Sequence, residues 1–285
     1  MQKELMITLW NGCYNRCFFC YNRGYYHFPI DLKAHLKYCL ELLKSDTIKE
    51  YNCIRLIGGE LFDGFIRENK IENEFIEILQ QVKRLIDNNI IEKVNVVTNL
   101  IYLDERDLDY TLNLFGDKIT LSTSYDMFGR FLNIANEMMW WNNIKHLQQD
   151  YPNLQVDVGI NVTQPFIEKV NKKWLDTFQE KLGKYSIEFN ELFTGIDNKN
   201  KEDCIFKEYF PKRKDFIRFL QSLKQWNYLN TIIRKDNIQL IHLIFDEKGN
   251  IEFKDTGKIP VTNQSYIDSD KSMLEDIERI ANADR

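Results

Sequence analysis

Three cysteines near the start of the chain could bind an iron–sulfur cluster. Cys13, Cys17 and Cys20 follow the first apolar segment with the spacing C-x-x-x-C-x-x-C, which brings three thiol groups into one short loop. A cubane 4Fe–4S cluster normally takes four thiolates, one on each iron. Three thiolates from one loop, with no fourth nearby, would leave one iron open to bind another molecule. The spacing therefore predicts a cluster with one iron available for chemistry.

Further motifs relate this loop to a known superfamily. The cysteine spacing, with aromatic Phe19 just before the third cysteine, resembles the cluster-binding loop of the radical S-adenosylmethionine (radical SAM) enzymes. Gly58-Gly59-Glu60 follows the apolar run Cys53–Ile57 and resembles the GGE at the end of that family's second strand. Thr98-Asn99 and Ser122-Thr123-Ser124 end the next two apolar runs at matching places. The cysteine loop and the GGE together make the resemblance specific.

The resemblance implies a reaction. In this family the open iron chelates S-adenosylmethionine, and reduction of the cluster cleaves a carbon–sulfur bond to give methionine and a 5′-deoxyadenosyl radical. That radical then abstracts hydrogen from a substrate. The implied cofactors are a 4Fe–4S cluster and S-adenosylmethionine, and the implied partner is an external electron donor such as flavodoxin or ferredoxin. We favour a nucleotide or other small-molecule substrate, because aromatic residues make up 13% of the chain and no peptide-docking domain is evident.

The resemblance also assigns roles to residues, although none is assigned as catalytic. Cys13, Cys17 and Cys20 would be the metal ligands. The backbone near Phe19 would contact the adenine, and the Gly58-Gly59 carbonyls and the Glu60 side chain would contact the ammonium. Ser122 or Ser124 would bind the ribose or the carboxylate, and Asn161 would bind the ribose. The two glycines would let the backbone pass close to the methionine. Asp126 is a further candidate contact.

Other interpretations of the cysteines stay open. A zinc site would need a fourth ligand, from Cys39, Cys53, Cys204, His27 or His35, and four-ligand zinc sites favour paired C-x-x-C halves. Disulfides are less compatible with a chain that begins without a signal peptide, so we expect a cytoplasmic location. The alternative functions are a peptide-modifying radical SAM enzyme and a non-enzymatic zinc or iron–sulfur module. Only Cys204 follows residue 53, so we expect no second cluster bound by this chain alone.

Bulk properties exclude several classes. The 285 residues are long enough for one large domain or two small ones, and the formal net charge is −5. That charge argues against broad binding to a nucleic-acid backbone, and the basic run 211–214 is better explained as the start of a solvated helix. No segment approaches the roughly 18 uncharged apolar residues of a membrane-spanning helix, so we expect no membrane partner.

Alternating apolar patterns predict strand–helix units. The predicted strands are 4–10, 53–57, 94–97, 119–123, 154–162 and 185–189, and the helices between them cover 31–43, 71–86, 105–115, 134–147 and 167–182. The first helix carries Cys39 on its apolar face, so we interpret that cysteine as a core residue. After residue 189 the pattern changes to a helix over 211–229, a hairpin of 239–245 with 250–253, and a helix over 270–283.

Six strand–helix units imply parallel strands, because each crossover returns the chain to the same end of the sheet. We therefore predict an α/β fold, a partial (βα)6 radical SAM barrel, with a C-terminal α+β extension. Residues 1–195 would form the barrel, and residues 196–285 would pack on it as helix, hairpin and helix. Every motif named above falls at a strand's carboxyl end, where parallel sheets bind their ligands.

Overall fold

The structure is a computed structural model. It describes residues 4–10, 12–17, 20, 31–191, 209–228 and 238–241. The predicted helix over 270–283 and the second strand of the predicted hairpin lie outside these residues. In the described part of the chain, no helix is both long enough and apolar enough to cross a membrane.

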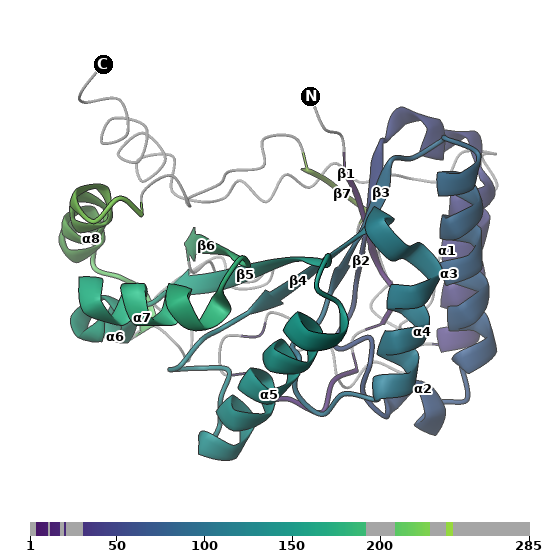
Figure 1. Ribbon diagram of the computed structural model, residues 1–285. Helices are drawn as coiled ribbons and strands as arrows, with labels where there is room; N and C mark the ends of the chain where they lie inside the picture. Colours follow the sequence, from purple (N-terminus) through teal and green to yellow (C-terminus); the bar gives the residue numbers. More distant parts are fainter. Residues whose placement is uncertain are drawn as a thin grey trace.

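One parallel sheet forms the centre of the molecule (Figure 1). Its strand order is β6-β5-β4-β3-β2-β1-β7, and every neighbouring pair is parallel. The described strands β6 and β7 lie at opposite edges, so the sheet is open. This arrangement confirms the predicted α/β fold and partial barrel. The strands are β1 Glu4–Thr8, β2 Cys53–Ile57, β3 Lys93–Val97, β4 Ile119–Ser124, β5 Gln155–Val162, β6 Ser186–Glu191 and β7 Ile238–Ile241.

Helices follow the strands and lie along the sheet, as Figure 1 shows for α1, α3 and α4 at one end and α6 and α7 at the other. Local sequence fixes where several of them begin. Asp31 caps α1, because its side chain accepts a hydrogen bond from Ala34 N, and Asp104 caps α4 in the same way. The helices are α1 Leu32–Lys44, α2 Phe65–Glu68, α3 Glu72–Asp87, α4 Glu105–Phe115, α5 Ile134–Asp150, α6 Gln164–Lys169, α7 Lys172–Leu182 and α8 Arg213–Gln225, with short 3-10 turns η2 Asp46–Glu50 and η3 Gly116–Lys118.

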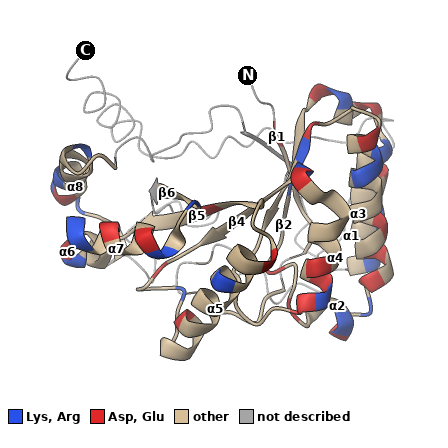
Figure 2. Ribbon diagram, viewed as in Figure 1, with Lys and Arg blue, Asp and Glu red and all other residues tan. Residues whose placement is uncertain are grey.

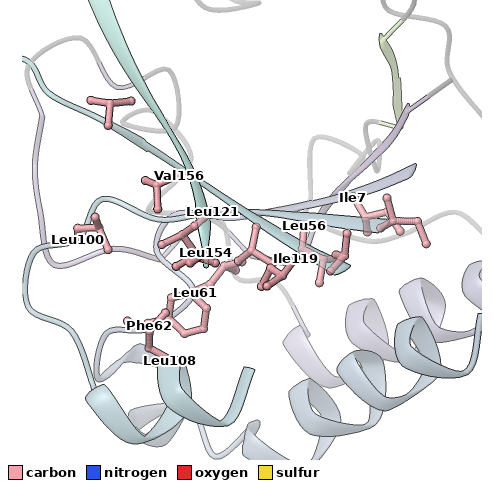
Figure 3. Close-up of a cluster of buried hydrophobic side chains, with 14 of the residues drawn as sticks. Ile7, Leu56, Leu61, Phe62, Leu100, Leu108, Ile119, Leu121, Leu154 and Val156 are labelled. Carbon is pink, nitrogen blue, oxygen red and sulfur yellow. The ribbon is translucent and has the colours of Figure 1, made fainter. Parts of the chain in front are cut away.

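The main core lies between the strands and the helices (Figure 3). Successive strand residues point to opposite faces of a sheet, so alternate positions supply this core. Leu56, Leu121 and Val156 are buried within it. Charged residues gather mainly on the helices, whereas the strands are mostly free of them (Figure 2). Burial of alternate apolar strand residues therefore fixes which face of the sheet the helices cover.

The other face of the sheet is largely polar. It carries the residues that alternate with the core positions, among them Asn95 on β3, Thr120 and Ser122 on β4, and Asp157 on β5. Cross-strand register aligns Asn95 with Thr120 and Ser122 with Asp157. In the partial barrel this is the inner face, and its side chains could contact a polar ligand.

Two predicted elements differ from the structure. The single helix predicted over 167–182 is two helices, because Val170 is extended and the Asn171 side chain caps α7 by accepting from Trp174 N at 3.0 Å. The segment predicted as the first hairpin strand joins the main sheet over its described residues, where β7 pairs with β1. The C-terminal segment thus contributes one strand to the sheet.

Candidate cofactor-binding site

The segments that carry the predicted motifs meet at one edge of the sheet. The cysteine loop follows β1, Gly58-Gly59-Glu60 follows β2, and Thr98-Asn99 follows β3. Because all strands are parallel, their carboxyl ends lie along the same edge. The structure therefore brings these three motifs side by side, as their positions in the sequence predicted.

Backbone hydrogen bonds attach the cysteine loop to the loop after β2. Gly59 N donates to Trp10 O at 2.7 Å, and Glu60 N donates to Gly12 O at 2.9 Å. These bonds continue the β1–β2 pairing beyond the strands themselves. These two bonds thus hold the start of the cysteine loop against the Gly-Gly-Glu segment.

Two side chains after β2 reinforce this attachment. Asp63 accepts from Tyr14 N at 2.9 Å through one oxygen and from Phe65 N at 2.9 Å through the other. The Phe65 ring lies against Gly12, where an added Cβ would come within 1.9 Å of the ring. A glycine at position 12 is therefore required for this close approach. Neither Asp63 nor Gly12 was among the site residues predicted from the sequence.

Glu60 braces two loops. It is only 1% exposed, and its carboxylate accepts from Leu61 N and Phe62 N in its own loop. The same group accepts from Thr98 Oγ1 at 2.7 Å and from Asn99 N at 2.6 Å, after β3. Burial raises its pKa to about 7, while the donors from Asn99 and Thr98 oppose that rise. The carboxylate thus connects the ends of β2 and β3.

Side-chain amides approach two of the cysteine sulfurs. Asn99 Nδ2 lies 3.5 Å from Cys13 Sγ, and Asn15 Nδ2 lies 3.4 Å from Cys17 Sγ. Asn15 is 1% exposed and also donates to the Arg130 carbonyl at 3.3 Å. The loops after β3 and β4 therefore both contact the cysteine loop.

The cysteines themselves are mostly shielded from solvent. Cys17 is 7% exposed, while Cys13 and Cys20 are partly buried. Burial raises the pKa of Cys17 to about 11, even though the nearby Arg130 charge lowers it, and burial also raises the pKa of Cys13. Ligation of a metal by these cysteines would require thiolates, so the thiols would have to release their protons first.

The donor set is chemically suited to an iron–sulfur cluster. Three cysteine sulfurs, two of them facing amide N–H groups, match the chemistry of cluster ligation. A zinc ion needs its ligands about 2.3 Å from one point. In the described part of the chain, no group of three or more His, Cys, Asp or Glu side chains, the three cysteines included, lies close enough together to hold a metal ion.

The alternative cysteine ligands that the structure describes have other neighbours. Cys39 is fully buried in the core on α1, where its sulfur lies 3.6 Å from His35 Nε2. Cys53 lies in β2, and its sulfur contacts Glu4. None of the described cysteines is in a disulfide. His27 and Cys204 lie outside the described residues.

A buried ion pair lies beside the cysteine loop, after β4. Arg130 Nε donates to Asp126 Oδ2 at 3.3 Å, and both side chains are largely buried. Asp126 Oδ1 accepts from Asn161 N at 2.8 Å, which ties the end of β5 to the loop after β4. Asp126 was a predicted contact and Arg130 was not, although the i,i+4 spacing of their opposite charges was an available signal.

The other predicted contacts fall at or near this edge. Ser122 and Ser124 alternate with core residues of β4, so they face the polar side of the sheet, and Ser124 also hydrogen-bonds Asp126. Asn161 lies near the end of β5 and is partly buried. An added Cβ at Gly58 would lie 2.9 Å from the Leu61 side chain and 3.1 Å from Trp10 O, so a larger residue there would have to displace these neighbours. Phe19 lies outside the described residues.

No protein-family model matches the chain, and no curated protein sequence matches it. Several solved structures do match the chain. A structure of anSMEcpe with bound AdoMet aligns with a TM-score of 0.57 at 18% identity, covering 84% of this chain and 64% of that one. A second, with bound AdoMet and the Kp18Cys peptide, gives 0.56 at 19% identity, covering 80% and 62%.

A structure of SuiB from Streptococcus suis gives a TM-score of 0.52 at 15% identity and covers 84% of this chain and 49% of that one. The chain thus spans less than two thirds of the length of these proteins. All of them are radical SAM enzymes. The open parallel sheet and its helices agree with that likeness. The chain has the partial-barrel fold of the radical SAM enzymes.

Proposed function

We propose that this chain is a radical SAM enzyme in which Cys13, Cys17 and Cys20 hold a 4Fe–4S cluster. One observation carries the proposal. The three-cysteine loop is hydrogen-bonded to the Gly-Gly-Glu loop and to Asn99, so the residues of the family's motifs form one connected structure. When bound, the cluster and S-adenosylmethionine supply the reductive cleavage that yields a 5′-deoxyadenosyl radical. The chain's own residues position these groups and exclude water.

The contacts support a revised role for Glu60. Its carboxylate already accepts four hydrogen bonds within the protein, so its function in this proposal is to position the loops after β2 and β3. The ammonium of S-adenosylmethionine would then be bound by the backbone carbonyls of Gly58 and Gly59. Ser124 and Asn161 lie at the neighbouring strand ends and would bind the ribose or the carboxylate.

The substrate would bind against the polar inner face of the sheet. Asn95, Thr120 and Asp157 are buried polar residues of that face, and Asn95 Oδ1 accepts no hydrogen bond from the described residues. Buried polar atoms favour a ligand that satisfies them. A small polar molecule, such as a nucleotide, is therefore our first candidate. A peptide is the second, because one structure with this fold holds a peptide.

Two further proposals concern the whole chain. We keep residues 1–195 as the barrel and 196–285 as an extension, with the addition that the extension supplies β7 to the sheet. Reduced thiols and an external electron donor such as flavodoxin or ferredoxin would suit a cytoplasmic enzyme.

The test is anaerobic purification, reconstitution with iron and sulfide, and measurement of the metal, the sulfide and the EPR spectrum of the reduced protein. We expect a brown protein with four irons per chain, whose EPR signal changes when S-adenosylmethionine is added. Incubation with dithionite, S-adenosylmethionine and a nucleotide or peptide library would then identify the substrate class. A colourless protein that binds zinc would contradict the proposal.

A further inference from the structure

We propose that the Asn99 and Asn15 side chains donate hydrogen bonds to the thiolates of Cys13 and Cys17 and so raise the reduction potential of the cluster. The inference rests on the proposed function, because it assumes that these cysteines ligate a cluster. It assigns both asparagines as positioning residues, which act on the cluster through its ligands.

The orientation of the Asn99 amide is determined by its contacts. Asn99 Oδ1 accepts a hydrogen bond from Ile101 N at 2.6 Å. A flipped amide would place its N–H groups against that backbone N–H, which is also a donor. The carbonyl oxygen is therefore held toward Ile101, and the Nδ2 group is held toward Cys13 Sγ at 3.5 Å.

The backbone of Asn99 is held as firmly as its side chain. Glu60 accepts from Asn99 N at 2.6 Å and from Thr98 Oγ1 at 2.7 Å. Glu60 is itself attached to the cysteine loop, because its backbone N donates to Gly12 O. The contacts thus form a continuous path from the end of β2, through Asn99, to the sulfur of Cys13.

Asn15 approaches the second sulfur from within the cysteine loop. Its Nδ2 group donates to Cys17 Sγ at 3.4 Å and to the Arg130 carbonyl at 3.3 Å. Both partners are acceptors here, so only the amide nitrogen can face them. Asn15 Oδ1 is buried without a hydrogen-bond partner among the described residues. The Asn15 amide is therefore oriented with its N–H donor toward the sulfur, even though this orientation leaves the amide oxygen without a partner among the described residues.

Hydrogen bonds to the cysteine sulfurs affect the reduction potential of the cluster because reduction adds negative charge. Reduction adds an electron to the cluster, and part of that negative charge resides on the ligand sulfurs. Donors that point at those sulfurs stabilise the reduced state more than the oxidised state. Removal of the donors should therefore make the cluster harder to reduce, with no change in its iron content.

The experiment measures the midpoint potential of the reconstituted cluster by EPR-monitored redox titration in the parent, Asn99→Ser, Asn15→Ser and the double variant. A serine at position 99 keeps a side-chain oxygen that can accept a hydrogen bond from Ile101 N, but it lacks the amide N–H₂ donor. Asn143→Ser is the matched control, because Asn143 Nδ2 donates to the Leu100 carbonyl, close in sequence to Asn99, and no described contact links it to a sulfur.

We expect both single variants to shift the midpoint potential to more negative values, the double variant to shift it further, and Asn143→Ser to leave it unchanged. If Asn99→Ser fails to retain iron, the potential of Asn15→Ser decides the inference. Variants with full iron and an unshifted potential would overturn the inference alone. A parent protein that assembles no cluster would instead overturn the proposed function.

Discussion

The Glu60 carboxylate accepts a hydrogen bond from the backbone N–H of Asn99 at 2.6 Å, and this contact joins the loop after β2 to the loop after β3. Because Glu60 N also donates to Gly12 O, one residue connects three consecutive strand ends. The glutamate of the Gly-Gly-Glu motif thereby holds together the edge of the sheet on which the cysteine loop rests.

Replacement of Glu60 by glutamine should destabilise the protein. At pH 8, above its pKa of about 7, the carboxylate accepts from four donors, and one of them would face the new amide N–H₂ group. We expect the free energy of unfolding in urea to fall by about 1–3 kcal/mol. Glu77→Gln, on the exposed side of α3, should change it by less than about 0.5 kcal/mol. Equal stabilities for the two variants would show that Glu60 does not brace these loops.

Gly12→Ala should displace the cysteine loop. The added Cβ would lie 1.9 Å from the Phe65 ring, so either the ring or the loop must move. We expect a loss of about 1–3 kcal/mol in unfolding free energy and a lower iron content after reconstitution. The double variant with Phe65→Leu, which removes the ring, should recover iron content relative to Gly12→Ala alone. If the double variant recovers nothing, the contact with Phe65 is not the reason for glycine here.

Gly59→Val should block S-adenosylmethionine and spare the cluster. The β-branched side chain would occupy the strand end where we propose that the methionine binds, whereas the ligands come only from residues 13–20. Iron content and the visible spectrum should match the parent, while the EPR change on adding S-adenosylmethionine should disappear. An EPR change with undiminished affinity would mean that the cofactor binds elsewhere.

Acid should weaken the fold through His35. Burial lowers the pKa of His35 to about 4 from its usual 6.5, so the folded protein keeps this ring neutral where the unfolded chain protonates it. Stability from this group is complete above pH 6.5 and is lost as the pH falls from about 6.5 to about 4, by up to about 3 kcal/mol. Urea unfolding at pH 7, 6 and 5 should show a steeper loss for the parent than for His35→Gln. Parallel curves would contradict this assignment.

The sequence predicted the sheet well because each strand is a short apolar run with a distinct boundary. β2 was expected at Cys53–Ile57, where it lies, and the apolar face of α1 correctly placed Cys39 in the core. Prediction was poorer where side-chain capping overrides apolar spacing. The apolar stripe through Val170 continues from α6 into α7, and the Asn171 cap separates the two helices.

The sequence predicted the site only at the level of which loops take part. Gly58-Gly59-Glu60 could be located from its motif, yet the direction of the Glu60 carboxylate depends on donors from residues 98 and 99. Asn15 was missed because its contact with the Arg130 carbonyl joins segments far apart in the sequence. A strand pattern also cannot specify its partner, so the pairing of β7 with β1 was not foreseen.

In the proposed function, three cysteines hold a cluster whose open iron activates S-adenosylmethionine. The most direct measurement is 5′-deoxyadenosine formed when anaerobically reconstituted protein is incubated with dithionite and S-adenosylmethionine. We predict its formation by the parent and by Cys39→Ala, which alters only the core at a cost of about 1–3 kcal/mol. Cys13→Ala, Cys17→Ala and Cys20→Ala should form none and should lose the cluster. Full iron content in Cys17→Ala, or no 5′-deoxyadenosine from a parent that carries the complete cluster, would contradict the account.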